Sequence, residues 1–79
     1  MSLFSQRLKE LRKSAGFTLT AVSKMLGISH VSYFNWEQGK TEPCINSIHK
    51  LCLIFDVSSD YLLGIENEDG TRAALPFIK

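Results

Sequence analysis

Apolar residues recur at steps of three and four along the first 64 residues, and turn-forming residues divide this pattern into five short segments. The first segment ends at Gly16 and should turn one helical face inward, formed by Phe4, Leu8, Leu11 and Ala15. Its other sides carry Arg7, Lys9, Arg12 and Lys13. Strand-like alternation of apolar and polar residues is absent from residues 1–64. The pattern therefore predicts an all-α fold of five helices.

Residues that start and stop helices mark the other four segments. The expected N-caps of the second, third and fifth helices are Thr18, Ser29 and Ser58. The expected ends of these helices are Gly27, Gly39 and Gly64. Pro43 suits a position just before or at the start of the fourth helix. The residues expected to face inward are Val22, Met25 and Leu26 in the second helix, and Ile45, Ile48, Leu51, Cys52 and Phe55 in the fourth.

A chain of 79 residues has room for one domain. We expect the helical domain over 1–64 and a C-terminal arm over 65–79. The arm opens on the acidic, turn-prone stretch "IENEDG" and continues into the apolar residues Leu75, Phe77 and Ile78. Two interpretations remain open for it: a flexible tail, or a segment that docks on the domain or on a second copy.

Several classes of protein are excluded by what the sequence lacks. No apolar run approaches the ~18 residues of a membrane span, and no signal-peptide core is present, so we expect a cytoplasmic protein. Cys44 and Cys52 would lie ~12 Å apart along a helix, too far for a disulfide, and we expect both to be small buried residues. There is no glycine-rich phosphate loop, carboxylate pair, metal-ligand cluster or nucleophile beside a base. We therefore expect no enzyme, no metal and no cofactor.

Charge is unevenly distributed along the chain. Residues 1–50 carry seven Lys or Arg against three acids, and residues 51–79 carry two against five. Chance scatter in a short chain is one explanation. A basic N-terminal part also suits a protein that presents one end to a polyanion.

The stretch "LGISHVSYFNWEQGK", residues 26–40, combines aromatic rings with short polar side chains on one expected helix. Tyr33 and Trp36 are three apart and should face the core. The short polar or small residues on or near the outward side are His30, Val31, Ser32 and Asn35. With the preceding helix and the turn "GIS", this segment fits a helix-turn-helix.

The runs "RLKELRKSAGFTLTAVSKMLGIS", "NWEQGKTEP" and "LCLIFDVSSDYLLG" resemble the Cro and phage-repressor type of helix-turn-helix domain, often called XRE-like. The resemblance covers residues 7–64. It implies a compact, lambda-repressor-like domain of five helices whose third helix lies in the DNA major groove.

On this resemblance, three residues of the third helix are expected to contact bases. His30 stands in the first turn, where the family often places a base or phosphate contact. Asn35 can bind adenine through two hydrogen bonds of its amide, and Val31 can pack against a thymine methyl. Phe34 departs from the family, which usually has a polar residue there. An exposed ring at that position can stack on a sugar, reach a thymine methyl or contact a partner subunit.

Other residues are expected to contact the DNA backbone without reading sequence. Lys40 and Thr41 match the loop that grips the backbone in the family. The remaining expected backbone contacts are Thr18 at the start of the second helix, Ser29 and Ser32 at the start of the third, and Gln38. Leu19 is a departure, because family members usually have Gln after the capping Thr, so one phosphate contact is expected to be missing.

The resemblance also pairs Arg12 of the first helix with Glu37 of the third in a partly buried ion pair. The alternative is two solvated charges. A buried pair would contribute mainly to the orientation of the third helix, because its net effect on stability is often small.

Together these observations predict a sequence-specific transcriptional regulator, a prophage-type repressor that binds a pseudo-palindromic operator on double-stranded DNA as a homodimer. The expected dimer surface comprises Tyr61, Leu62, Leu75, Phe77 and Ile78. The alternatives are an antitoxin or other protein-binding module with the same fold, and a controller protein of a restriction–modification operon.

Overall fold

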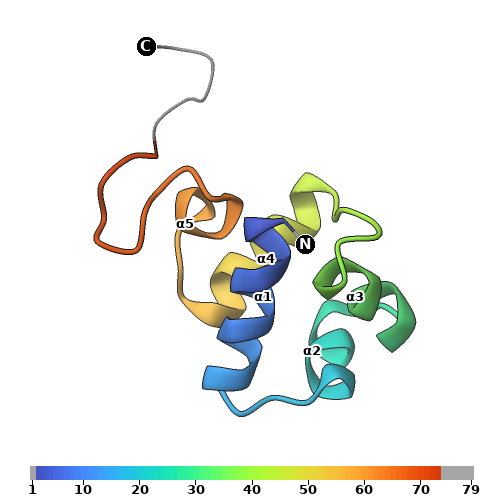
Figure 1. Cartoon of the computed structure of the whole chain (residues 1–79). Coiled ribbons are helices and arrows are strands. Elements are labelled where there is room, and N and C mark those ends of the chain that lie inside the picture. Colours follow the sequence, from blue (N-terminus) through green and yellow to red (C-terminus); the bar gives the residue numbers. More distant parts are fainter. Residues whose placement is uncertain (1, 74–79) are drawn as a thin grey trace.

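The computed structural model describes residues 2–73, and this part of the chain contains five α-helices (Figure 1). They are α1 (Leu3–Ser14), α2 (Leu19–Leu26), α3 (His30–Glu37), α4 (Ile45–Phe55) and α5 (Ser59–Leu63). Among the described residues, strand-like pairing is limited to one isolated antiparallel bridge between Glu66 and Arg72. The predicted all-α fold of five helices is confirmed. No helix within residues 2–73 has the length and apolar character needed to cross a membrane.

The predicted helix caps are confirmed at the atomic level. The side-chain oxygens of Thr18, Ser29 and Ser58 each accept a hydrogen bond from the backbone N–H three residues further on. Such a bond satisfies one of the backbone donors that a helix start leaves free. Gly27 and Gly64 follow α2 and α5 with positive φ, as predicted for helix ends.

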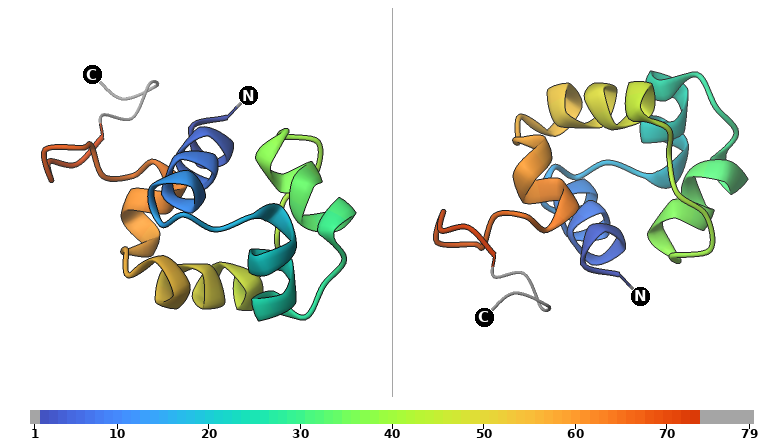
Figure 2. Two further views of the ribbon diagram at one scale, coloured as in Figure 1. Left: turned by 90° about the horizontal axis from the view of Figure 1, so that it is seen from below. Right: turned by 90° about the horizontal axis from the view of Figure 1, so that it is seen from above.

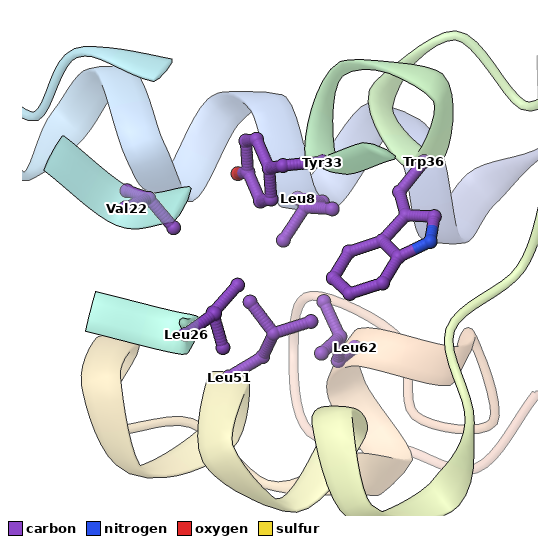
Figure 3. Close-up of a cluster of buried hydrophobic side chains, with 7 residues drawn as sticks. All are labelled: Leu8, Val22, Leu26, Tyr33, Trp36, Leu51 and Leu62. Atoms are coloured by element: carbon purple, nitrogen blue, oxygen red, sulfur yellow. The ribbon is translucent and has the colours of Figure 1, made fainter. Parts of the chain in front are cut away.

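The helices form a compact bundle rather than a layered sheet structure. α1 packs against α3 and α5, α2 packs against α3 and α4, and α4 packs against α5 (Figure 2). Every helix contributes to one buried apolar cluster, whose side chains converge on a common centre (Figure 3). Its members are Leu8, Val22, Leu26, Tyr33, Trp36, Leu51 and Leu62.

Four expected core residues are instead at the surface. Met25 is 46% exposed, because the buried face of α2 is centred on Val22, Ser23 and Leu26. Ser23 can be buried there because its hydroxyl donates to the carbonyl of Thr20. The other three lie at helix boundaries, beyond the stretches that pack on the core: Ala15 as the C-cap of α1, Cys44 as the N-cap of α4, and Ile45 in its first turn.

Arg7 is the largest departure from the expected solvated side of α1. It is only 4% exposed, and its guanidinium lies 4.1 Å from the centre of the Tyr61 ring. Its Nη1 donates to the carbonyl oxygens of Tyr61 and Glu66, the latter at 2.7 Å. Arg7 therefore ties α1 to α5 and to the turn that follows α5.

That turn occupies residues 65–73 and folds back on itself. The N–H of Ala73 donates to the carbonyl of Ile65, and the N–H of Asn67 to that of Thr71. The predicted turn in this acidic stretch is thus present. Residues 74–79, which include the expected dimer residues Leu75, Phe77 and Ile78, lie outside the described residues.

Leu62 was expected in the dimer surface, and this expectation is wrong. Its side chain is fully buried in the apolar cluster between α1 and α4 (Figure 3). α5 has only five residues, so a single turn must supply both its core contact and its exposed face. The following residue, Leu63, is 44% exposed, and Tyr61 is half-buried under Arg7.

Candidate nucleic-acid interface

The turn between α2 and α3 fixes the direction in which α3 leaves α2. Gly27 adopts a left-handed conformation with φ 72°, which a residue with a side chain adopts only with strain. The N–H of Ile28 then donates to the carbonyl of Ser23 at 3.0 Å, and the half-buried Ile28 side chain packs against the core. α3 therefore starts at a defined angle to α2, as in a helix-turn-helix.

Three residues hold the inner side of α3 to the body of the domain. Tyr33 and Glu37 are essentially inaccessible, and Trp36 is 8% exposed. The rings of Tyr33 and Trp36 meet edge to face with centroids 5.9 Å apart. The inward orientation predicted for both rings is confirmed.

The outer side of α3 follows from the position of its buried side. Successive residues turn by about 100°, so the direction opposite the buried face points along Val31, with residues 34, 35 and 38 beside it. Val31 is 56% exposed and Phe34 39%, His30 and Ser32 are exposed, and Asn35 is half-buried. Of the three expected base-contacting residues, Val31 and the half-buried Asn35 thus lie on the outer side of α3, and His30 is exposed at its first position.

The expected ion pair between Arg12 and Glu37 is confirmed. Two parallel bonds join the side chains, Nε to Oε2 at 2.7 Å and Nη2 to Oε1 at 3.1 Å. The carboxylate side of this pair is 2% exposed and the guanidinium side 13%. The hydrogen bonds that Arg12 donates to the Glu37 carboxylate raise the pKa of Arg12 above its ordinary value, so the guanidinium stays charged. Because Arg12 also donates to the carbonyl of Phe17, one guanidinium joins α1, α3 and the loop before α2.

Tyr33 lies beside this pair with a hydroxyl that has no hydrogen-bond partner among the described residues. Burial raises the pKa of that hydroxyl far above its ordinary value of 10, and the neighbouring Glu37 carboxylate adds to the effect. Because a buried polar group without a partner lowers stability, the hydroxyl is expected to contribute nothing favourable to folding.

We therefore expect Tyr33→Phe to leave the free energy of unfolding unchanged or slightly raised at pH 8. The pKa of Tyr33 is higher in the folded than in the unfolded state, so ionisation of the unfolded chain makes the free energy of unfolding fall as pH rises above about 10. Urea unfolding at pH 8 and 10.5 should show a smaller alkaline loss of stability in Tyr33→Phe than in the parent chain. Equal losses in the two proteins would contradict this assignment.

The expected backbone-contacting residues stand at helix ends. Thr18 and Ser29 are the N-caps of α2 and α3, and the hydroxyl of Ser29 also donates to that of Ser32 at 3.0 Å. Beyond α3, the N–H of Lys40 donates to the carbonyl of Asn35 at 3.0 Å, which sets the loop close to the helix end. Lys40 and Thr41 are exposed, and Gln38 is half-buried as the C-cap.

Not all expected site residues lie together. α3 and the turn after α5 stand on opposite sides of the domain (Figures 1 and 2). The expected DNA-contacting residues are therefore separate from Tyr61 of the expected dimer surface. Phe34, for which the sequence left contacts to a sugar, a thymine methyl or a partner subunit open, is exposed next to Val31 on the outer side of α3.

Comparisons with known proteins agree with this geometry. The helix-turn-helix family model HTH_3 matches residues 8–62. The chain is 39% identical over 61 residues to the SPbeta prophage-derived HTH-type transcriptional regulator YonR of Bacillus subtilis, covering 77% of this chain and 56% of that protein. The structure is similar to that of the P22 c2 repressor in complex with a synthetic operator, with a TM-score of 0.74, 33% identity and coverage of 80% of this chain and 96% of that one.

A second solved structure is the restriction–modification controller protein C.AhdI from Aeromonas hydrophila, with a TM-score of 0.68, 27% identity and coverage of 75% of this chain and 89% of that one. The chain spans little more than half the length of its curated relatives YonR and YobD of B. subtilis, 56% and 59% respectively. The match of the family model to most of the chain confirms the resemblance to Cro and the phage repressors, and the chain belongs to the helix-turn-helix family HTH_3.

Proposed function

We propose that this chain is a sequence-specific DNA-binding transcriptional regulator that inserts α3 into the major groove. The observation that carries the proposal is the two-sided character of α3. Two rings and an ion pair hold one side, while the polar His30 and Ser32 and the apolar Val31 and Phe34 are exposed away from it. A groove-reading helix needs such a rigid attachment together with short donors and acceptors close to its backbone. The role requires neither a catalytic step nor a cofactor.

The contacts divide into two groups with different consequences. His30, Val31 and Asn35 meet base edges and carry the sequence preference. The residues that hold phosphates are Thr18, Ser29, Ser32, Gln38, Lys40 and Thr41. These contacts set the position of the domain on DNA and make binding salt-dependent, but they do not discriminate between sequences.

More specifically, we propose that the chain is a prophage-type repressor that acts in the cytoplasm as a homodimer on a pseudo-palindromic operator. A single domain of this size contacts few base pairs, and a dimer doubles the contacts and sets two α3 helices about 34 Å apart. The names of YonR and of the P22 repressor support the prophage assignment. The dimer contact is placed at Tyr61 and the exposed Leu63, with Leu75, Phe77 and Ile78 as a second contribution.

Asn35→Ala and Lys40→Ala should weaken DNA binding in different ways. Asn35→Ala should cost about 1–3 kcal/mol on the best site and relax the preference at one position, because a base contact is lost. Lys40→Ala should weaken binding on all sequences alike and reduce the salt slope by about one, because a phosphate contact is lost. Selection of bound sequences from random DNA, followed by affinity measurements at several salt concentrations, tests both.

The same selection reports half-site spacing and symmetry, and thereby tests the dimer. If the two variants changed the selected sequences in the same way, the division into base and phosphate contacts would be wrong. A protein that stayed monomeric at micromolar concentration and on DNA would contradict the homodimer.

A second candidate is a protein-binding module such as an antitoxin, which the exposed Val31 and Phe34 on α3 favour. The salt dependence of binding separates the two functions. Affinity that depends on phosphate contacts falls steeply as the salt concentration rises, whereas affinity that depends on apolar protein contacts hardly changes. A restriction–modification controller, the function named for C.AhdI, would bind DNA through the same face.

A further inference from the structure

We propose that the segment 74–79 binds back into an apolar groove of its own domain, with Leu75 and Phe77 as the side chains that enter it. The groove lies between the start of α1, the loop before α4 and the end of α5, and its volume is about 360 Å³. The segment lies outside the described residues, whereas the groove is formed by described ones. Its lining includes Leu3, Phe4, Glu42, Pro43, Ile48 and Leu63.

The groove is an apolar surface that continues the core outward. Leu3 and Leu63 are 45% and 44% exposed, although both are large apolar side chains. Phe4 and Ile48 are half-buried, and Phe4 packs against the buried cluster. Ile65, two residues beyond Leu63, is a further 41% exposed. Apolar side chains gathered in this way are typical of a surface that another segment covers.

The described part of the chain ends close to this groove. Gly64, which follows Leu63, lies so near to α1 that a Cβ atom added to it would be 3.0 Å from Cδ2 of Leu3. The N–H of Ala73 in turn donates to the carbonyl of Ile65, the residue after Gly64. Four extended residues span about 13 Å, which gives Phe77 the reach to enter the groove from Ala73.

The sequence of the segment, "ALPFIK", fits an apolar groove with one acidic residue in its lining. Pro76 opposes a helix, and in an extended chain alternate side chains share a side, so Leu75 and Phe77 point the same way. Lys79 has the charge that complements Glu42. Because Leu63 belongs to the proposed dimer surface, a docked segment would lie within that surface and leave Ile78, on the opposite side, free to contact a second copy.

Two other arrangements are less favourable. A second groove, between α5 and the turn after it, is lined by Leu11 and Val57 but also by Glu66 and Glu68. Phe77 placed there would take carboxylates out of water without pairing them. In the groove at the start of α1, the same segment of a second copy would compete with a tethered one. A short tether gives an effective concentration in the millimolar range, so docking within one chain prevails at micromolar protein.

Magnetic resonance spectra of the full chain, with labelled leucine and isoleucine methyl groups, test the inference in the absence of DNA. The ring protons of Phe77 should give nuclear Overhauser effects to the methyl groups of Leu3 and Leu63, and these effects should persist on dilution. Phe77→Ala should abolish them and shift the methyl signals of both leucines, because a ring no longer lies against them.

Matched variants separate docking from general changes in the protein. Leu3→Ala should weaken the effects between Phe77 and Leu63, because it removes part of the groove. Leu53→Ala is the same chemical change at a side chain that is 70% exposed on α4 outside the groove, and it should leave these effects unchanged. Ile78→Ala should also preserve them, because Ile78 is expected to point away from the groove.

Three results would overturn the inference. Identical signals of the groove residues in the parent chain and in Phe77→Ala would show that the segment does not enter the groove. Effects from Phe77 to Leu11 or Val57 would place the segment in the second groove. In a mixture of labelled and unlabelled chains, effects found only between copies would assign the groove to the segment of a second copy. DNA binding is measured separately, so none of these results would bear on the proposed DNA-binding function.

Discussion

Replacing Arg12 by methionine should lower the free energy of unfolding by about 3 kcal/mol, because it leaves the carboxylate of Glu37 buried without its partner. That carboxylate side chain is 2% exposed and both of its oxygens bond to Arg12. Methionine keeps much of the apolar stem of arginine, so the loss reports mainly the missing charge. The expected value is at the lower end of the range for buried pairs, since Arg12 itself is 13% exposed. Urea unfolding at neutral pH measures the change.

The double variant Arg12→Met/Glu37→Leu is the control that separates pairing from burial. Replacing both charges by apolar residues of similar size is often neutral or stabilising, so the double variant should recover most of the loss. If it were as unstable as Arg12→Met alone, the bond from Arg12 to the carbonyl of Phe17 would be the important contact. The pair would then contribute little through Glu37.

The same double variant tests what the pair contributes to the proposed function. The ion pair connects α1 with α3, the helix proposed to enter the groove. An apolar replacement can restore stability without restoring a directional, two-bond attachment. We therefore expect the double variant to fold stably and to bind DNA more weakly than the parent chain.

The fold was largely predictable because the signals that define it are local. A cap such as Thr18 or Ser29 satisfies a backbone N–H only three residues away, so the sequence alone contains both partners. The helical period likewise placed Tyr33 and Trp36 in the core. The Arg12–Glu37 pair is different: 25 residues separate its partners, and only the resemblance to a known family indicated it.

The structure differs from the predictions at residues whose burial is set by contacts with segments distant in the sequence. Arg7 is buried because carbonyl oxygens 54 and 59 residues away accept from it and because the Tyr61 ring covers it. Nothing in the neighbouring sequence indicates these partners, and arginine is ordinarily exposed. Met25 is exposed where the helical period predicted a core residue, for a similar reason. The direction from which α3 and α4 approach α2 decides which edge of its apolar face is covered.

The burial of Leu62 on α5, the shortest helix, is also set by contacts with other helices, and a substitution there should strongly lower stability. Leu62→Ala should lower the free energy of unfolding by about 2–5 kcal/mol, because it opens a cavity at a fully buried site. The cluster that it joins contains leucines from α1, α2 and α4, so the cavity would lie where four helices meet (Figure 3). Because Leu62 is a core contact within one molecule, the decrease in the free energy of unfolding should not depend on protein concentration.

Leu63→Ala is the matched control, with the same chemical change one residue further along α5 and a side chain that is 44% exposed. It should change the stability of the folded monomer by less than about 0.5 kcal/mol, as surface substitutions usually do. If Leu63 belongs to the proposed dimer surface, Leu63→Ala should instead raise the dissociation constant of the dimer in sedimentation experiments. The opposite assignment, with Leu62→Ala affecting association and Leu63→Ala affecting monomer stability, would mean that α5 is rotated by about one residue, or 100°, from the orientation described here.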